Sequence, residues 1–495
     1  MGVLRMVTVE PVRLLFTMAL AMHSLASRDL VHRKVCLSRL NETMCGKGEG
    51  SPDLAGNTSY SRAIQEDVAS FCFYLDICAN LLGILVSSVF GSASDRFGRR
   101  GLLLLPSLGL ILGSVSCLMQ SYFLLLPLYY MFFSSALTGL FGFYQASYIA
   151  TMSCICDITD HSDRSFRLGV MESMGLIGGP IGMVLVSPLL HTDYYAVVFF
   201  IVILSQVAVL AYVHYWLEET VDVRAFQDNS RDSGGVTSGQ SPQSICSVVG
   251  WSLRRTLMIY VIWRTENRRQ LLLINQTVGV LSSVGSSGEI DLTRLYTSKP
   301  PLSWAPFTLL AYLSVKDAVR GMILAVGMPL LYVHISHWSI RSDMILAMIT
   351  LLSSSASLVL RAFASNTLMM MLVPLVGCLS GFPNTLISSI KCKLVDSNEF
   401  GAVFACTMLI QTICHLSGRA LFQLLYTATL PIWPRLPFLV MGILLVTFLS
   451  IITYMWCLSG HLVKKDKMDA RQQLINSYGG GEEETELSSS PKTTK

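Results

Sequence analysis

The stretch that decides the fold is GSASDRFGRR, residues 91–100, which separates two apolar runs at residues 68–90 and 101–119. Each run is long enough to cross a bilayer as a helix. Glycines near both ends of the stretch permit a tight turn, because glycine accepts backbone angles that other residues avoid. The stretch also carries three arginines, and short basic loops stay on the cytosolic side. We therefore predict a helical hairpin across the membrane, with this loop in the cytosol.

The composition extends this prediction to the whole chain. Of 495 residues, 52% are hydrophobic and 14% are charged, and the mean hydropathy is +0.54. Soluble domains carry about 25% charged residues. The composition therefore predicts an all-α polytopic membrane protein in contact with the lipid bilayer. It gives no support for nucleic-acid binding, for a metal site or for the catalytic constellation of an enzyme, and we expect no cofactor.

Apolar runs predict two sets of six spans. The predicted units are an N-terminal half at 1–217, a cytosolic linker at 218–269, a C-terminal half at 270–458 and a disordered cytosolic tail at 459–495. The first extracellular loop is predicted at 28–67. The predicted spans are 8–27, 68–90, 101–119, 122–150, 168–190 and 196–217 in the first half, and 270–288, 306–331, 344–364, 367–390, 402–428 and 436–458 in the second.

The distribution of basic residues gives the orientation. With these spans, loops and tails on the linker side carry 22 Lys and Arg, and those on the other side carry 9. The positive-inside rule then predicts that both termini are cytosolic. Two glycosylation sequons, at Asn41 and Asn57, fit the extracytosolic first loop. Cys36 and Cys45 in that loop are candidates for a local disulfide, whereas most other cysteines lie in apolar runs and are expected to be small buried hydrophobic residues.

Ionisable residues within predicted spans are candidates for function, because they are expensive in hydrocarbon. Glu172 lies among glycines and aliphatic residues, and burial there favours the neutral carboxyl that a proton carrier needs. A structural pair with Arg167 near the interface is the alternative. Asp76, with Asn80 one turn later, and Gln145 are predicted to line a substrate path.

Two further clusters lie in the second half. Gln411, His415, Arg419 and Gln423 recur every four residues and form one polar stripe, which must face a cavity or the bundle interior. Arg419 suits an anionic group of a substrate, and His415 titrates near neutral pH. Lys316, Asp317 and Arg320 are interpreted as a self-neutralised cluster rather than a substrate site.

The pattern G-x-x-x-D-R-x-G-R-R resembles the loop between helices 2 and 3 of major facilitator transporters. That resemblance implies the twelve-helix major facilitator fold with two six-helix halves. It also assigns Asp95 and Arg99 to a charge network that latches the halves on the cytosolic side, with Arg96 and Arg100 in the same gating loop.

Segments in both halves are similar to one branch of that superfamily, the proton-coupled folate transporter family of solute carriers. They include LDI at 75–77, RLGVME at 167–172, LSW at 302–304, KLV at 393–395 and GAVF at 401–404. The resemblance places Glu172 on the helix-5 carboxylate implicated in proton coupling. It implies uptake of folates or other amphipathic, often anionic solutes at the plasma membrane or in endolysosomes.

Three departures weaken the folate assignment in particular. Residues 282–285 lack the family's intramembrane His, Ser388 stands in place of an Arg, and Ser303 stands in place of a disulfide-forming Cys. We therefore predict proton-coupled symport of an amphipathic organic anion that is folate-like, muropeptide-like or cyclic-dinucleotide-like. A proton-independent facilitator and a non-transporting receptor or scaffold are the alternatives.

Overall fold

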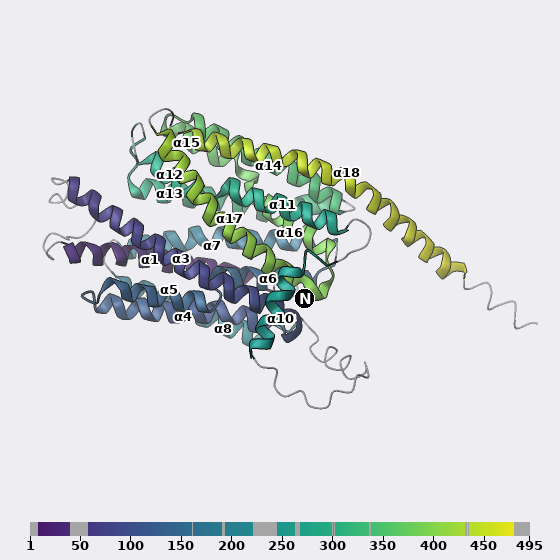
Figure 1. The fold of residues 1–495 in the computed structure, drawn as a ribbon, viewed down its shortest axis with the longest axis horizontal. Coiled ribbons are helices and arrows are strands. Elements are labelled where there is room, and N and C mark those ends of the chain that lie inside the picture. Colours follow the sequence, from purple (N-terminus) through teal and green to yellow (C-terminus); the bar gives the residue numbers. More distant parts are fainter. Residues whose placement is uncertain are drawn as a thin grey trace, which may run out of the picture.

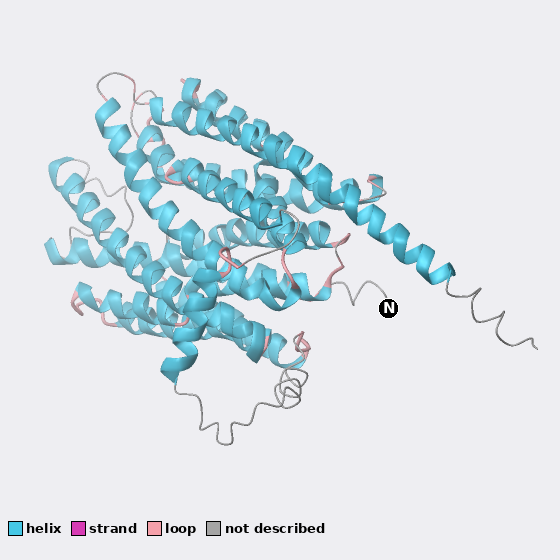
Figure 2. Ribbon diagram, turned by 45° about the vertical axis from the view of Figure 1, so that its right-hand side comes forward, coloured by secondary structure: helices cyan, strands magenta, loops and turns pink. Residues whose placement is uncertain are grey.

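The computed structural model describes residues 8–39, 58–160, 162–190, 194–220, 245–262, 268–298, 300, 302–335, 338–430, 433 and 435–479. Every regular element in these residues is a helix, and the helices form one elongated bundle (Figures 1 and 2). The all-α fold expected from the composition is confirmed.

In the part of the N-terminal half that the structure describes, there are seven α-helices and one 3₁₀ turn. Their bounds are α1 Glu10–Arg39, α3 Thr58–Phe97, α4 Arg99–Tyr122, η1 Leu128–Tyr130, α5 Met131–Leu140, α6 Phe143–Ile158, α7 Arg164–Leu190 and α8 Tyr195–Tyr215. The helix α10, Ile245–Met258, follows and lies within the predicted linker.

The C-terminal half repeats this layout. Its elements are α11 Arg268–Ser286, α12 Glu289–Thr297, α13 Pro306–His334, α14 Ile340–Phe363, α15 Thr367–Val376, η2 Cys378–Gly381, α16 Phe382–Leu394, η3 Ser397–Glu399, α17 Phe400–Thr429 and α18 Leu436–Gly479.

Among the described residues, eight helices are long and apolar enough to span a membrane, or nine if the bent pair α15 and α16 is one span. The predicted span at 122–150 is broken into two helices, and the predicted span at 270–288 corresponds to α11, which α12 continues after a break. Gly142, with φ of 87°, separates α5 from α6, and Gly288, with φ of 76°, separates α11 from α12. Counting each broken segment once and including the charged helix α13 gives the expected arrangement of six plus six.

The two halves pack through pairs of helices that are distant in the sequence. In particular, α3 packs on α17 and α7 packs on α13. Gly321 of α13 faces Leu176 and Ile177 of α7 so closely that an added Cβ would lie 2.7 Å from Ile177. One continuous apolar core includes residues of both halves, such as Met171 and Met328. Small residues therefore bring the halves together along their shared interface.

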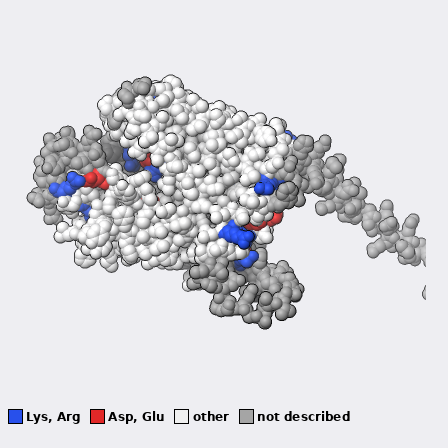
Figure 3. Space-filling model, in the orientation of Figure 1, with Lys and Arg blue, Asp and Glu red and all other residues white. Residues whose placement is uncertain are grey.

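The two ends of the bundle, called the linker end and the loop end, carry different segments of the chain. The linker end carries α10 and the α3–α4 turn, and lies on the right in Figure 1; the loop end carries Arg39 and the start of α3. Figure 3 shows that charged side chains gather near the two ends and leave the middle of the visible face without charge. An uncharged belt between charged ends fits a lipid-facing surface.

Several boundaries differ from the predictions. Helix α1 continues to Arg39 and α3 begins at Thr58, so much of the predicted loop 28–67 is helical. Helix α18 continues to Gly479, where a disordered tail was predicted from 459. The charged residues after 459 are good helix formers without proline, so they extend the preceding span. The sequons at Asn41 and Asn57, Cys45 and the Gly/Ser-rich part of the linker lie outside the described residues.

Candidate functional site

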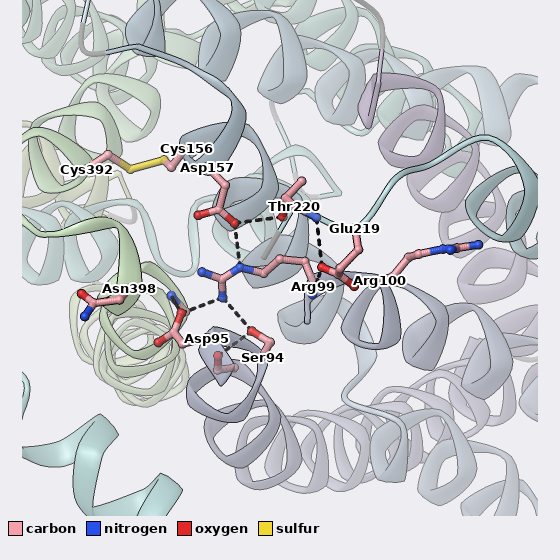
Figure 4. A network of polar contacts seen from close by, with 12 residues as sticks. Ser94, Asp95, Arg99, Arg100, Cys156, Asp157, Glu219, Thr220, Cys392 and Asn398 are labelled. Atoms are coloured by element: carbon pink, nitrogen blue, oxygen red, sulfur yellow. Dashed lines mark hydrogen bonds and ion pairs between the residues drawn. A yellow bond between two sulfur atoms is a disulfide. The ribbon is translucent and has the colours of Figure 1, made fainter. Parts of the chain in front are cut away.

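The turn between α3 and α4 places a buried ion pair at the linker end. Gly98 adopts φ of 104°, which only glycine accepts readily, and it brings Arg99 back towards Asp95. The Arg99 Nη1 and Asp95 Oδ1 atoms are 2.7 Å apart, and both side chains are 1% exposed (Figure 4). The same guanidinium donates from Nε to Asp157 of α6 at 2.9 Å and from Nη1 to Ser94 at 2.8 Å. A buried charge is stable only when paired in this way.

Asp95 also holds the beginning of α17 in the opposite half. Its Oδ1 accepts the backbone N–H of Gly401 at 2.8 Å, and its Oδ2 accepts that of Ala402 at 3.1 Å. These are unpaired N–H groups at the first turn of a helix, where negative charge is favoured. A Cβ on Gly401 would lie 2.5 Å from Arg99 Nη1 and 2.7 Å from Asp95 Oδ1. Glycine at 401 is therefore what allows the carboxylate to reach the helix.

The other two predicted gating residues hold neighbouring elements. The Arg96 guanidinium lies over the ring of Trp251 in α10, 3.9 Å from its centroid. Arg100 donates to the carbonyls of Val213 and His214 in α8, so it fastens the loop within its own half. Glu219 accepts the backbone N–H groups of Arg99 at 2.6 Å and of Arg100 at 3.1 Å.

A second set of contacts crosses between the halves beside this ion pair. Arg164 Nη1 donates to the Cys392 carbonyl at 2.7 Å, and Lys393 Nζ donates to Ser165 Oγ at 2.8 Å. Lys393 is also paired with the buried Asp343 at 2.7 Å. A disulfide joins Cys156 of α6 to Cys392 of α16 (Figure 4), so the expectation of a merely buried thiol is wrong for Cys156. The linker end is therefore bound across the halves at several points.

Sequence reasoning missed most of these partners. Asp157, Glu219, Gly401 and Lys393 are ordinary residue types far from the motif in sequence. The sequence marks only a helix start near Gly401 and Lys393, and not the contacts themselves. Gly401 opens the predicted span at 402–428, and basic residues precede that span, as expected for a helix start at the membrane surface.

Glu172 lies in the first third of α7 and is buried. Its Oε2 atom has no hydrogen-bond partner among the described residues, and the Arg13 guanidinium of α1 interacts with it electrostatically. Arg13 donates to the Tyr144 hydroxyl at 2.8 Å and lies over the rings of Tyr144 and Tyr148, at 4.8 and 5.3 Å. Arg167 instead pairs with Glu10 at 3.0 Å. The alternative that Glu172 forms a structural pair with Arg167 is therefore wrong.

The predicted path residues form two groups. In the N-terminal half, Gln145 Nε2 donates to Asn80 Oδ1 at 3.0 Å, and Asp76 pairs with Arg28 at 3.0 Å. Both ions of that pair are partly exposed, in contrast to the latch.

In the C-terminal half, Arg419 pairs with Asp291 of α12 at 2.7 Å. His415 is exposed, interacts electrostatically with both of those residues, and lies on the same stripe as the half-buried Gln411. Arg294 of α12 lies within electrostatic range of both Arg28 and Arg419, so charges from the two groups meet at the loop end.

Cys36 is disulfide-bonded, and Cys45 lies outside the described residues, so the Cys36–Cys45 pair stays a prediction. Among the described residues, no group of three or more His, Cys, Asp or Glu could hold a metal ion.

Two helical halves that share one interface, with a buried ion pair joining them at the linker end and buried ionisable groups between the ends, are the arrangement of a secondary membrane transporter. The chain belongs to the Major Facilitator Superfamily, whose family model matches residues 59–418.

Comparison with known proteins places the chain among solute carriers. It is 24% identical to the lysosomal proton-coupled steroid conjugate and bile acid symporter SLC46A3 of Gallus gallus, over 92% of this chain and 95% of that protein. It is 26% identical to the proton-coupled folate transporter of Rattus norvegicus, over 87% and 88%. The resemblance to that branch is thus confirmed.

Among solved structures, the human organic anion transporter MFSD10 (TETRAN) matches 89% of this chain and 99% of that one, with a TM-score of 0.62 and 14% identity. The proton:xylose symporter XylE matches with a TM-score of 0.57. These likenesses confirm the major facilitator fold.

Proposed function

We propose that this chain is a proton-coupled symporter for an amphipathic organic anion and works by alternating access. The observation that carries the proposal is the environment of Glu172. It is a buried carboxyl in a membrane-spanning helix, one of its oxygens has no hydrogen-bond partner among the described residues, and the cation that interacts with it is Arg13. A carboxyl in this setting gains or loses a proton at a cost that its neighbours control.

The position of Glu172 also supports coupling between its proton and the conformation of the halves. Tyr148 of α6 interacts electrostatically with Glu172, and it interacts with Ser388 of α16 across the interface. Arg13 contacts the same tyrosine ring. A change in the charge of Glu172 therefore acts on residues that touch the opposite half, which is what a symporter needs.

Asp95 and Arg99 act in this proposal as the latch of the linker end, and Asp76, Gln145, Gln411, His415 and Arg419 line the path from the loop end. His415 is a second candidate for proton movement. The linker end is assigned to the cytosol because its loops carry most of the basic residues, which also places both termini there. The names of the relatives support a lysosomal membrane and solutes such as steroid conjugates, bile acids or folates. The plasma membrane is the other location that the family resemblance implies.

The test is uptake of labelled taurocholate, estrone sulfate, methotrexate and muramyl dipeptide by cells with the protein at the surface, at pH 5.5 and 7.4. We expect acid-stimulated uptake of at least one solute, and its loss in Glu172→Gln. Glu218→Gln makes the same chemical change at an exposed site and should keep wild-type uptake.

Two outcomes would count against the proposal. Uptake that depends neither on pH nor on the Glu172 substitution would support the alternative of a proton-independent facilitator. Failure to take up any of the four solutes, with surface expression verified, would favour a receptor or a solute of another class.

A further inference from the structure

A cavity of about 70 Å³ lies inside the C-terminal half, and neither the Asp95–Arg99 pair nor Glu172 lines it. It is lined by residues of α11 to α16 and of α18, including the four ionisable residues Glu289, Lys316, Arg320 and Arg361. A single water needs about 10–15 Å³ on the same measure. The cavity therefore has room for a group the size of a carboxylate, sulfate or phosphate.

One carboxylate holds two cations in this cavity. Glu289 Oε1 accepts from Lys316 Nζ at 2.9 Å and from Arg361 Nη1 at 2.7 Å. The side chains of Lys316 and Arg361 are 6% and 2% exposed, whereas that of Glu289 is 16% exposed. The two cations are thus fixed more deeply than the carboxylate that joins them.

The expectation of a self-neutralised cluster is therefore wrong for Lys316. Arg320 does pair with Asp317 at 3.3 Å, but Lys316 reaches across to Glu289 of α12. A sequence gives no sign of this contact, because Glu289 lies 27 residues earlier.

The charges of this group do not balance. Three cations, Lys316, Arg320 and Arg361, face two carboxylates, Glu289 and Asp317, and the hydroxyl of Tyr312 is the other titratable group beside them. One positive charge is left over at membrane depth, where an uncompensated charge costs several kcal/mol. The Nε atoms of Arg320 and Arg361 are also buried with no partner among the described residues. Both the surplus charge and the free donors favour an anion from outside the chain.

The break between α11 and α12 adds to this preference. Gly288 is the N-cap of α12, with φ of 76°, and it has no side chain with which to cap the first turn of that helix. Glu289 is the first residue of α12, so the helix begins at the cavity. A broken transmembrane helix that begins at a polar cavity is a recurrent way of favouring anionic substrate groups.

We propose that this cavity binds the anionic head group of the transported solute, which takes the place of Glu289 on Lys316 and Arg361. Glu289 then acts as a resident counter-ion: it neutralises the cations while the site is empty and yields to the solute when it binds. This inference rests on the proposed function for the identity of the solute, but not for the binding of an anion.

The test uses the full chain, purified in lipid nanodiscs, and inorganic sulfate as the probe. Thermal unfolding is followed at 0–20 mM sulfate, with gluconate replacing it at constant ionic strength. We expect a weak stabilisation of the wild type, because Glu289 competes with sulfate. In Glu289→Gln the apparent sulfate affinity should rise roughly tenfold, since the competing charge is gone. Arg361→Gln and Lys316→Gln should lose the response.

The control is Arg341→Gln, at the opposite end of α14 from Arg361, which should respond as wild type does. A response in Glu289→Gln no larger than in wild type would overturn the proposal. So would equal responses in wild type, Lys316→Gln and Arg361→Gln. If Glu289→Gln does not fold, Lys316→Gln still tests the proposal. Loss of its sulfate response supports the proposal, and a response equal to that of wild type overturns it. The measurement needs no proton gradient, so its failure would leave the uptake test of Glu172 unaffected.

Discussion

The carboxylate of Asp95 in the N-terminal half accepts the backbone N–H of Gly401 in the C-terminal half, at 2.8 Å. The same oxygen is 2.7 Å from Arg99, so one atom joins the turn of the motif to the start of α17. The motif thus acts on the opposite half through a helix end rather than through a charged side chain there.

Replacing Asp95 with Asn should open the linker end. The change leaves Arg99 paired only with Asp157 and removes the charge at the α17 N-terminus, at a cost of about 3–5 kcal/mol for a broken buried pair. We expect a lower melting temperature and transport below roughly a tenth of wild type, since one face no longer closes. Asp396→Asn removes an exposed carboxylate from the turn before α17 and should change neither quantity.

Two glycine substitutions test the close approach at α17. Gly401→Ala would place a Cβ 2.5 Å from Arg99 Nη1, and we expect destabilisation by about 1–3 kcal/mol from overpacking. Gly101→Ala, in α4, meets no atom within 4 Å and should leave the melting temperature unchanged or slightly higher. Equal effects of the two substitutions would show that the space at 401 is not critical.

The disulfide between Cys156 and Cys392 should make transport sensitive to redox conditions. It joins α6 to α16 across the halves, so the linker end cannot open while it is intact. Diamide should stop uptake and dithiothreitol should restore it, whereas Cys156→Ser and Cys392→Ser should be insensitive to both. With a protease site placed in the linker, the cut halves of diamide-treated protein should separate on a denaturing gel only after reduction. Cys154→Ser, at a free buried thiol, serves as the control.

The two arginines near Glu172 should differ in their effect on pH dependence. Arg13 stabilises the charged form of Glu172, so Arg13→Gln should favour its protonation and move the acid stimulation of uptake to higher pH. Arg167 pairs with Glu10, and Arg167→Gln should lower stability or expression without moving the pH profile. Identical profiles for the two variants would contradict the role given to Arg13.

The sequence was sufficient for the fold and for the two members of the Asp95–Arg99 pair. Asp95 and Arg99 share one turn, and their spacing with Gly98 is a local property that a motif can record. Their partners Asp157 and Gly401 come from other helices, and nothing in their immediate surroundings predicts the contact. The pairing of Lys316 with Glu289 could not be predicted either, because these two residues also lie on different helices.

Helix ends are predicted less well than the helices themselves, because clusters of charged residues are typical of loops. In α1 the charged residues at 28–39 stay helical, since Arg28 pairs with Asp76, Arg39 pairs with Asp67, and Lys34 donates to Gln120 at 3.3 Å. Each of these pairs joins α1 to α3 or α4. Neighbouring helices therefore supply the partners that water supplies in an exposed loop.

The burial of the Asp95–Arg99 pair has a consequence for the energetics of opening. Separating α3 from α17 must admit water to two charged side chains that are 1% exposed and to the backbone N–H groups of Gly401 and Ala402. Opening of the linker end is therefore a hydration reaction, in which solvent molecules are reactants. The balance between the closed and open forms should accordingly follow the water activity of the compartment that the linker end faces.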